Sequence, residues 1–185
     1  MNKRVLTVVF LFSVLPAVSD AQQVLKDLRS LRVEAEDWCT RYDRDTYPYP
    51  RSIEAAIIRS QGGLFSPYDQ TCFSSPLQSD VEHIVAIAEA HASGMCGRSK
   101  REKAQFASDL VNLTLATPEL NRGQKIAKDA AEWLPAANRC WYAAQIVAVK
   151  KKYRLSVDKK ERQALTRILR HCRAVEMEIP ACATK

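Results

Sequence analysis

Apolar residues recur at steps of three and four positions in several stretches of the chain, which is the spacing of helices with one buried face. This pattern predicts a first helix over about 24–36 and a second over about 53–61. The C-terminal part follows the same pattern over 139–153 and again over 158–172, where an aspartate and a glutamate three residues apart provide an N-terminal capping signal. Helices therefore dominate the predicted structure.

The middle of the chain has short segments of extended character. Residues 64–73 suggest a small hairpin, residues 80–85 form a β-leaning run, and residues 111–116 are strand or extended. Helices are expected between them, over about 86–94 and over about 99–110, where Ser99 with Glu102 forms a capping-box pattern. A small β element at the centre of a helical chain indicates an α+β fold that is mostly α.

The first 21 residues have the pattern of a secretory leader. Two basic residues precede an apolar run over 5–18, and small residues follow it. The run is shorter than the roughly 20 residues that a membrane-spanning helix needs, and no later segment is long and apolar enough to span a bilayer. We expect a signal peptide over 1–21 and a mature chain over 22–185 that forms a single domain without a membrane partner.

All the cysteines lie after the leader; they are Cys39, Cys72, Cys96, Cys140, Cys172 and Cys182. An even number of cysteines in an exported chain favours disulfides. Zinc is the alternative, but no two cysteines have the short spacing of a zinc site and no matching pair of histidines follows. Three disulfides are therefore expected, and the sequence leaves their pairing open.

The chain has a formal net charge of +7, and removal of Lys3, Arg4 and Asp20 with the leader takes away two positive charges and one negative charge, leaving +6. A polyanionic partner fits this charge. A basic surface that only keeps an exported protein in solution fits it equally well, because net charge concerns solubility and non-specific binding rather than one partner. The choice depends on motifs.

An acid and an imidazole stand side by side in "DVEHIVAIAEAH", residues 80–91, in a chain with three histidines. An imidazole has an ordinary pKa of about 6.5 and suits proton transfer near neutral pH. Neighbours in a strand point to opposite faces, so Glu82 and His83 share a site only at a strand end or by flanking one substrate group. The role of His91, on the next expected helix, stays open.

Two later segments give this pair a context. Read together, "DVEHIV" (80–85), "NLTLA" (112–116) and "LNRGQK" (120–125) resemble the HNH, or ββα-metal, endonucleases. They are most similar to the GmrSD-type HNH endonuclease family, many of whose members are small exported proteins. The segments "YDRDTYPY", "GLFSPYDQT", "KDAAEWLP" and "RCWYAAQIVAVKKKYRLSVDKKERQAL" share the resemblance, which therefore covers most of the mature chain. It implies a ββα-metal core over about 64–135 with flanking helices over 139–172.

The resemblance also implies a role for individual residues. His83 is the general base, Glu82 and Asn121 hold the metal, and Asn112 braces the ββα loop and orients the base. One carboxylate and one amide oxygen suit a hard divalent ion with open positions, Mg²⁺ above all and Mn²⁺ as the alternative. Many family members have Asp where Glu82 stands, so the geometry of the metal site is expected to differ by one methylene.

Three cations follow the metal-binding asparagine. Arg122, Lys125 and Lys128 are spaced so that two or three of them could face a phosphate backbone. The alternative is a solvated basic face without a ligand.

The function expected from these residues is that of an exported, secreted or periplasmic endonuclease. It would hydrolyse DNA with one divalent ion, with RNA as a second candidate substrate, and with little sequence preference because backbone contacts carry no sequence information. Two alternatives remain: a nucleic-acid-binding or uptake protein without turnover, and a nuclease toxin delivered to competitors. Nothing in the sequence indicates an oligomer, so a monomer is expected.

Overall fold

The computed structural model describes residues 20–182, so the predicted leader lies outside the described residues apart from its last two positions. Helices make up most of the regular structure, and two short strands form an antiparallel sheet. The expected α+β, mostly α fold is confirmed. In the described part of the chain, no helix has the length and apolar character needed to cross a membrane.

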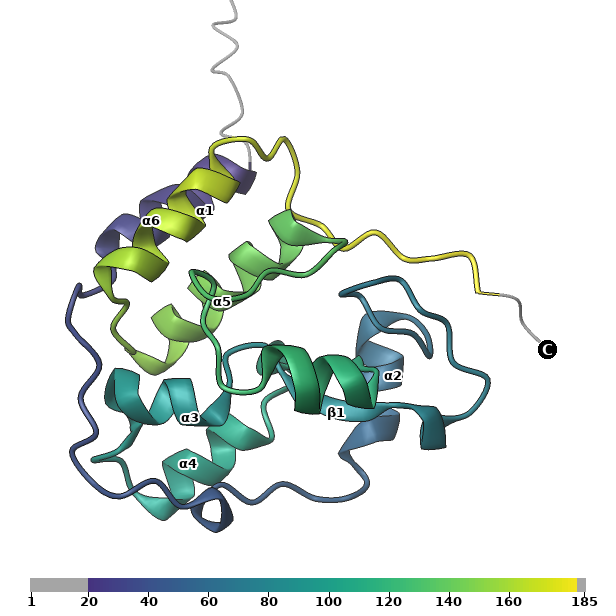
Figure 1. Ribbon diagram of the computed structural model, residues 1–185, viewed down its shortest axis with the longest axis horizontal. Helices are drawn as coiled ribbons and strands as arrows, with labels where there is room; N and C mark the ends of the chain where they lie inside the picture. The colour runs from purple at the N-terminus through teal and green to yellow at the C-terminus, as the bar shows by residue number, and fades with distance from the viewer. Residues whose placement is uncertain (1–19, 183–185) are drawn as a thin grey trace, which may run out of the picture.

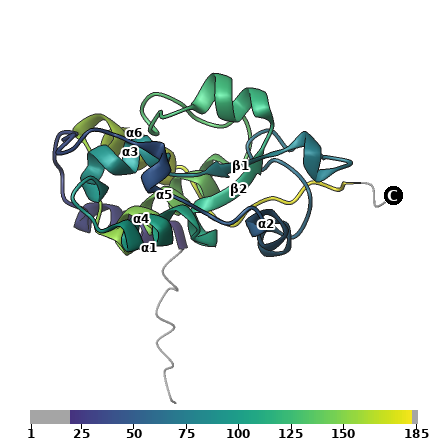
Figure 2. The same cartoon turned by 90° about the horizontal axis from the view of Figure 1, so that it is seen from below.

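The helices form a layer beside the sheet (Figures 1 and 2). α1 (Asp20–Ser30), α5 (Arg139–Tyr153) and α6 (Lys159–Leu169) pack against one another. α2 (Ile53–Gln61) lies toward the other end of the molecule, where it packs on the sheet. The first and last helices, α1 and α6, therefore lie side by side although they are far apart in sequence.

The sheet brings the two halves of the predicted site together. β1 (Asp80–His83) and β2 (Leu113–Ala116) run antiparallel, with His83 opposite Leu113. A sheet of two four-residue strands is too small to be stable alone. The helices that pack around it therefore provide the stability that the strands lack.

Two helices follow the strand β1 closely. α3 (Ile87–Ala90) runs directly into a wider π turn, η3 (His91–Met95), so the helix expected over 86–94 changes its geometry part-way. Gly94 lies at φ +123, a backbone conformation that side chains with a Cβ rarely adopt, which explains a glycine at this position.

α4 (Lys100–Ala107) begins with the capping pattern that the sequence predicted. The Ser99 hydroxyl accepts a hydrogen bond from the Glu102 backbone N–H at 3.3 Å, and the Glu102 carboxylate accepts one from the Ser99 N–H at 3.0 Å. The helix ends three residues earlier than expected. The remaining short helical segments are η1 (Arg44–Thr46), η2 (Pro76–Gln78), η4 (Leu110–Asn112) and η5 (Leu120–Lys125).

The first helix differs from the prediction over 24–36. It starts at Asp20 and ends at Ser30, and the following backbone is extended, with Val33 paired in parallel to Val157. Val157 donates its N–H to Arg32 O at 2.9 Å and accepts from the Glu34 N–H at 3.1 Å. A distant segment supplies these backbone partners, so the helical periodicity of the sequence gives way to a tertiary contact.

Three disulfides join Cys39 to Cys96, Cys72 to Cys182, and Cys140 to Cys172. This confirms the expectation for all the cysteines and supplies the pairing that the sequence left open. The largest hydrophobic cluster draws on α1, α3, α5 and α6 through residues such as Leu28, Ile87, Trp141 and Leu165. The disulfides Cys39–Cys96 and Cys140–Cys172 tie segments at the edge of this cluster together.

Candidate active site

His83 lines a cavity of about 340 Å³ whose walls come from four segments. The loop over 42–49, β1, the start of α3 and the η5 turn each contribute side chains. Glu82, His83 and Asn121 all line it, although Asn121 is far from the other two in sequence. The cavity therefore contains both of the predicted metal ligands and the predicted base.

His83 is held in one tautomer by a backbone carbonyl. Its Nε2 lies 2.9 Å from the carbonyl oxygen of Ala107, at the end of α4. A carbonyl oxygen can only accept a hydrogen bond, so Nε2 carries the hydrogen and Nδ1 keeps the lone pair. Burial lowers the pKa of His83 to about 3, and the positive charges of Arg44 and Lys125 act in the same direction against the effect of the Ala107 carbonyl. The imidazole is therefore neutral near pH 7.

Glu82 is buried beside a buried lysine. The Lys125 Nζ lies 2.7 Å from Glu82 Oε1, and it donates a hydrogen bond to the carbonyl oxygen of His83 at 2.9 Å. Although the Lys125 charge is close, Oε1 has no partner with the geometry of a hydrogen bond. Burial raises the pKa of Glu82, and the Lys125 charge opposes that rise. The carboxylate thus has a counter-charge in direct contact with Oε1, and a ligand at that oxygen would have to displace the ammonium group.

Asp80 connects Asn121 to Arg122. Its Oδ2 accepts a hydrogen bond from Asn121 Nδ2 at 3.1 Å and another from Arg122 Nε at 2.7 Å, and its Oδ1 lies 2.5 Å from Arg122 Nη2. Asp80 and Glu82 lie two residues apart on β1, so they share one face of the strand. Asp80 was not among the predicted site residues. Its position in "DVEH", two residues before Glu82 on the same strand, could have indicated that it lies beside the site.

Asn112 braces the turn that follows His83. Its Oδ1 accepts a hydrogen bond from the Val85 N–H at 2.8 Å, and its Nδ2 donates to Val85 O at 3.1 Å. The Asn112 carbonyl also accepts from the Ile84 N–H at 2.9 Å. Asn112 is fully buried and does not line the cavity. Its contacts are those of a residue that positions the backbone beside the base.

The three cations predicted to contact nucleic acid lie in different surroundings. The Arg122 side chain is 73% exposed, and Lys128 is also exposed and donates to Gln124 O at 2.8 Å. Lys125, in contrast, is fully buried, so the structure does not place its ammonium group on the surface as expected. The η5 turn directs Asn121 and Lys125, four residues apart, toward the sheet, and this local geometry could not be read from charge spacing alone.

Two residues of the cavity were missed by the sequence reasoning. Arg44 is exposed at the cavity and lies over the Tyr49 ring, with its guanidinium carbon 5.2 Å from the ring centroid. The Tyr49 ring lies 5.5 Å from the His83 ring. Both belong to "YDRDTYPY", a segment that carried the resemblance without any role attached to its residues. The loop therefore contributes a cation and an aromatic wall next to His83.

Two tyrosines lie in the interior near Glu82. The hydroxyl groups of Tyr68 and Tyr142 are buried without a hydrogen-bond partner, and their rings are 5.6 Å apart. Burial raises the pKa of both well above the usual value, and the negative charge of Glu82 adds to the rise. Both hydroxyls therefore stay protonated at neutral pH.

His91 has a structural environment. It is almost fully buried, its Nδ1 lies 2.8 Å from the Tyr47 hydroxyl, and its Nε2 lies 2.9 Å from Thr40 O. Rings of Trp38, Tyr42 and Tyr47 surround it. Both ring nitrogens already have partners, and His91 does not line the cavity. The role of His91, which the sequence left open, is therefore structural.

A second group of carboxylates lies outside the cavity. Glu36, Asp129 and Asp158 each bring one oxygen within 4.8 Å of the others. Asp158 accepts a hydrogen bond from the Glu161 N–H at 2.8 Å, and Asp129 accepts from the Ala131 N–H at 2.7 Å. Two of the three carboxylates thus already cap backbone N–H groups, which accounts for their positions without a ligand.

The comparison with known proteins agrees with the geometry of this cavity. The model of the GmrSD restriction endonucleases, C-terminal domain, matches residues 39–168. The chain belongs to this family. The match begins at Cys39 and includes every segment that lines the cavity, and it leaves out α1. Membership in the GmrSD C-terminal domain family indicates a nuclease-type function.

One individual protein of similar length also matches the chain. An uncharacterized secreted protein of Arthroderma benhamiae is 27% identical over 181 residues, which cover 85% of this chain and 87% of that protein. No solved structure matches the chain. The predicted relation to the GmrSD family is confirmed, and the similarity to a secreted protein is consistent with the expectation of export.

Proposed function

We propose that the protein is an endonuclease that hydrolyses phosphodiester bonds of DNA in the cavity lined by His83. One observation carries the proposal: the Ala107 carbonyl holds the hydrogen on Nε2 and leaves Nδ1 of a neutral imidazole as a base beside Glu82 and Asn121. The GmrSD restriction endonuclease family supports DNA as the substrate class. RNA remains a second substrate to be tested with the same assay.

The proposed reaction is a hydrolysis with a single proton acceptor. His83 takes a proton from water, the water oxygen forms a bond to phosphorus, and the bond from phosphorus to the 3′ oxygen breaks. The 3′ oxygen takes up a proton from solvent, which leaves a 3′ hydroxyl and a 5′ phosphate. An imidazole that is neutral at the working pH is ready to accept this proton. Ala107 keeps the ring from turning, so the accepting nitrogen stays in one orientation.

The donor set suits one hard divalent cation. Glu82 offers a buried carboxylate oxygen, which Lys125 contacts, and Asn121 offers an amide oxygen in the same cavity. Glu82 and Asn121 would hold Mg²⁺, or Mn²⁺ as the alternative, which would supply positive charge to offset the phosphate and the departing 3′ oxygen. Lys125 already neutralises Glu82, so metal and ammonium compete for Oε1.

The cations around the cavity support binding to a backbone rather than to bases. Arg44 lines the cavity, and Arg122 is exposed next to it on the Asp80 carboxylate. A fork of guanidinium donors suits phosphate oxygens. Contacts of this kind carry affinity without sequence information, so we propose cleavage with little sequence preference.

Export is proposed on three grounds. The sequence begins with the pattern of a signal peptide, the structure has three disulfides, and the Arthroderma benhamiae relative is a secreted protein. Disulfides persist in oxidising compartments. The periplasm and the extracellular medium both meet this condition.

The deciding experiment is the nicking of supercoiled plasmid by the oxidised mature protein, with Mg²⁺, with Mn²⁺ and with chelator. We expect cleavage that needs the metal and that His83→Ala abolishes. His83→Gln serves as the second variant, because its side-chain amide can still donate to Ala107 O while lacking a basic nitrogen. Both variants are compared with the parent by circular dichroism and by DNA binding in chelator.

Full cleavage by either variant would overturn the role of His83. DNA binding without cleavage under both metals would contradict the enzyme and favour the binding or uptake protein instead. Cleavage that is undiminished in chelator would contradict the metal requirement while leaving the proposed base in place.

A further inference from the structure

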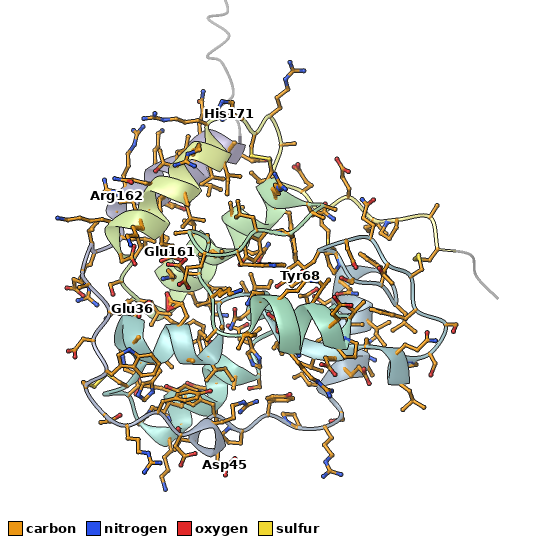
Figure 3. The ribbon with its side chains drawn as sticks, in the orientation of Figure 1. Glu36, Asp45, Tyr68, Glu161, Arg162 and His171 are labelled. Carbon is orange, nitrogen blue, oxygen red and sulfur yellow. A yellow bond between two sulfur atoms is a disulfide. The ribbon has the colours of Figure 1, made fainter. Side chains whose placement is uncertain are left out.

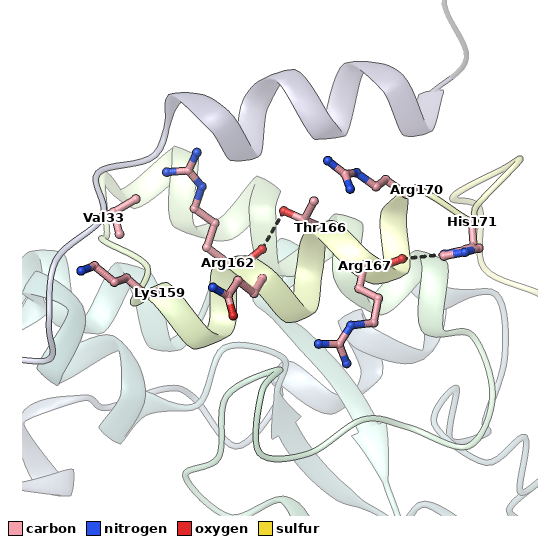
Figure 4. Close-up of a pocket in the computed structure, with 8 residues that line it drawn as sticks. Val33, Lys159, Arg162, Thr166, Arg167, Arg170 and His171 are labelled. Atoms are coloured by element: carbon pink, nitrogen blue, oxygen red, sulfur yellow. Dashed lines mark hydrogen bonds between the residues drawn. The ribbon is translucent and has the colours of Figure 1, made fainter.

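α6 carries a row of cations along a groove of its own. Lys159, Arg162, Arg167 and Arg170, together with His171, line a cavity of about 610 Å³ between α6 and the segment that follows α1 (Figure 4). We call this the α6 groove. Its remaining lining residues are Val33, Gln163 and Thr166, so no carboxylate lines it.

The cations of the α6 groove are not neutralised by neighbours. Within residues 20–182, none of these four side chains forms a salt bridge. The lysines of the preceding helix differ, since Lys150, Lys151 and Lys152 each contact a carboxylate. Arg162 and His171 project outward from α6 in Figure 3. The groove therefore presents concentrated positive charge to solvent.

The stability of α6 does not explain this arrangement. Cations near a helix C-terminus interact favourably with the helix dipole, which accounts for Arg167 in the last turn. Cations in the first turn interact unfavourably with it, yet Lys159 is the first residue of α6 and Arg162 follows within one turn. The N-terminal cations thus oppose the dipole, and a partner outside the helix gives them a role.

The spacing of the row fits a repeating anion. Lys159, Arg162 and Arg170 lie three and eight residues apart, so they fall on one side of α6. Arg167, five residues from Arg162, projects to the other side (Figure 4). The eleven steps from Lys159 to Arg170 span about 16 Å at 1.5 Å per residue. One strand of duplex DNA places a phosphate every 3.4 Å along the axis, so a backbone that runs along the row passes several phosphates over its length.

The groove is built on a fixed element. Leu165 and Leu169 bury the inner face of α6, Glu161 contacts Lys150 of α5, and Cys172 is joined to Cys140 at the start of α5. The cations therefore do not need to order a loop when they bind. In Figures 1 and 2, α6 lies at one end of the molecule and β1 near its middle, and no residue lines both the α6 groove and the cavity of His83, so the two are separate.

We propose that the α6 groove is an anchoring site for the phosphate backbone of nucleic acid, distinct from the catalytic cavity. The proposal rests on the proposed function only in taking nucleic acid as the substrate. A long substrate would engage both sites at once, which raises the effective concentration of the scissile strand at the cavity. A substrate with a single phosphodiester bond would reach only one site at a time.

The test measures binding without turnover. The His83→Ala mature protein in chelator is titrated with a fluorescein-labelled duplex of about 40 base pairs, about 136 Å long at 3.4 Å per step, by fluorescence anisotropy at several salt concentrations. The variant adds Lys159→Gln and Arg162→Gln, the two cations that oppose the helix dipole. The matched control adds Lys100→Gln and Arg101→Gln, which remove the same charge from two exposed residues of α4.

We expect the groove variant to bind roughly tenfold more weakly at low salt. The slope of log affinity against log salt should fall by about two, because each lost phosphate contact removes about 0.9. The α4 control should keep the parental slope. Equal binding by the groove variant and the parent, or an equal loss in the α4 control, would overturn the proposal. So would binding of the groove to anionic phospholipid vesicles in place of DNA.

A second arm separates the groove from the active site. With His83 present, the groove substitutions should raise KM for plasmid and leave hydrolysis of a small single phosphodiester, bis(4-nitrophenyl) phosphate, unchanged. An equal loss on both substrates would contradict an anchoring role. If no protein cleaves under any metal, the proposed function fails while the anisotropy result still decides the groove.

Discussion

The Lys125 Nζ lies 2.7 Å from Glu82 Oε1, and both side chains are almost completely buried. The same ammonium group donates to the backbone carbonyl of His83 at 2.9 Å. One lysine therefore contacts both members of the acid–imidazole pair. A buried ion pair adds little net stability, because desolvation offsets the attraction, but the loss of one partner leaves an uncompensated charge.

We predict that Lys125→Met lowers the free energy of unfolding by about 3–5 kcal/mol, because it leaves Glu82 buried without its counter-charge. Urea denaturation measures this loss. Added Mg²⁺ should stabilise the variant more than the parent, since the ion would take the place of the ammonium group at Glu82.

The matched control is the double variant Glu82→Gln/Lys125→Met, which removes both charges. Its free energy of unfolding should fall less than that of Lys125→Met alone, and added Mg²⁺ should not raise it. An equal Mg²⁺ response in the two variants would contradict Glu82 as a ligand.

Asn112→Ala is predicted to cost both stability and cleavage. The substitution leaves the buried N–H and C=O groups of Val85 without their side-chain partners, and each unpaired group costs about 1–3 kcal/mol. Cleavage should fall further than the folded fraction, because the backbone next to His83 loses its brace. Unfolding curves and plasmid nicking at a temperature where the variant is fully folded separate the two effects. Unchanged nicking by the folded variant would show that the brace does not position the base.

Asp80→Asn tests a positioning role. The ion pair with Arg122 is exposed on the arginine side, so its loss should change stability by less than about 1 kcal/mol. We expect a lower kcat/KM, because Asn121 and Arg122 lose the carboxylate that holds them both. Glu34→Gln is the control: it breaks an exposed contact with Arg32 away from the cavity. Equal kinetics for the two variants would assign Asp80 a purely structural role.

Lys150 joins two buried carboxylates, Glu89 and Glu161, and this cluster predicts a pH-dependent stability. Burial raises the pKa of Glu161 to about 8, against the attraction of Lys150. The folded protein then keeps a proton that the unfolded chain releases above its ordinary value of 4.5, so stability should fall as pH rises from about 4.5 to about 8.

Glu161→Gln should remove most of this dependence, because an amide cannot ionise and can still accept a hydrogen bond from Lys150. Urea denaturation of both proteins at three pH values between 5 and 9 measures it. Parallel stability curves for the two proteins would mean that Glu161 does not hold the proton. Lys150→Met, in contrast, should destabilise the protein at every pH.

Local patterns in the sequence were sufficient to predict several helices and their caps. The Ser99 cap of α4, the short helix α2 and the aspartate cap of α6 depend on residues within one turn of each other, and the structure has all three. Asp158, for example, accepts from the Glu161 N–H three residues on. Interactions of this range are encoded in adjacent residues, so a sequence predicts them well.

Local patterns could not predict the contacts between segments that are distant in sequence. The end of α1 depends on the pairing of Val33 with Val157, and the pairing of Cys72 with Cys182 joins a hairpin to the C-terminal segment. Neither partner can be recognised from the periodicity around its own residue. The helix over 24–36 was therefore extended too far, and the disulfide pairing stayed open.

The sequence by itself determined the chemistry that is available: the Glu82–His83 pair, the two asparagines, the cysteines and the cations, together with the family that these motifs indicate. Only the tertiary structure decided which groups meet. It buried Lys125 against Glu82, placed the Ala107 carbonyl on Nε2 of His83, and left the cations of α6 without carboxylates. The reason is physical: the pKa of a group and the availability of its charge depend on burial and on neighbours, and folding brings those neighbours from distant parts of the chain.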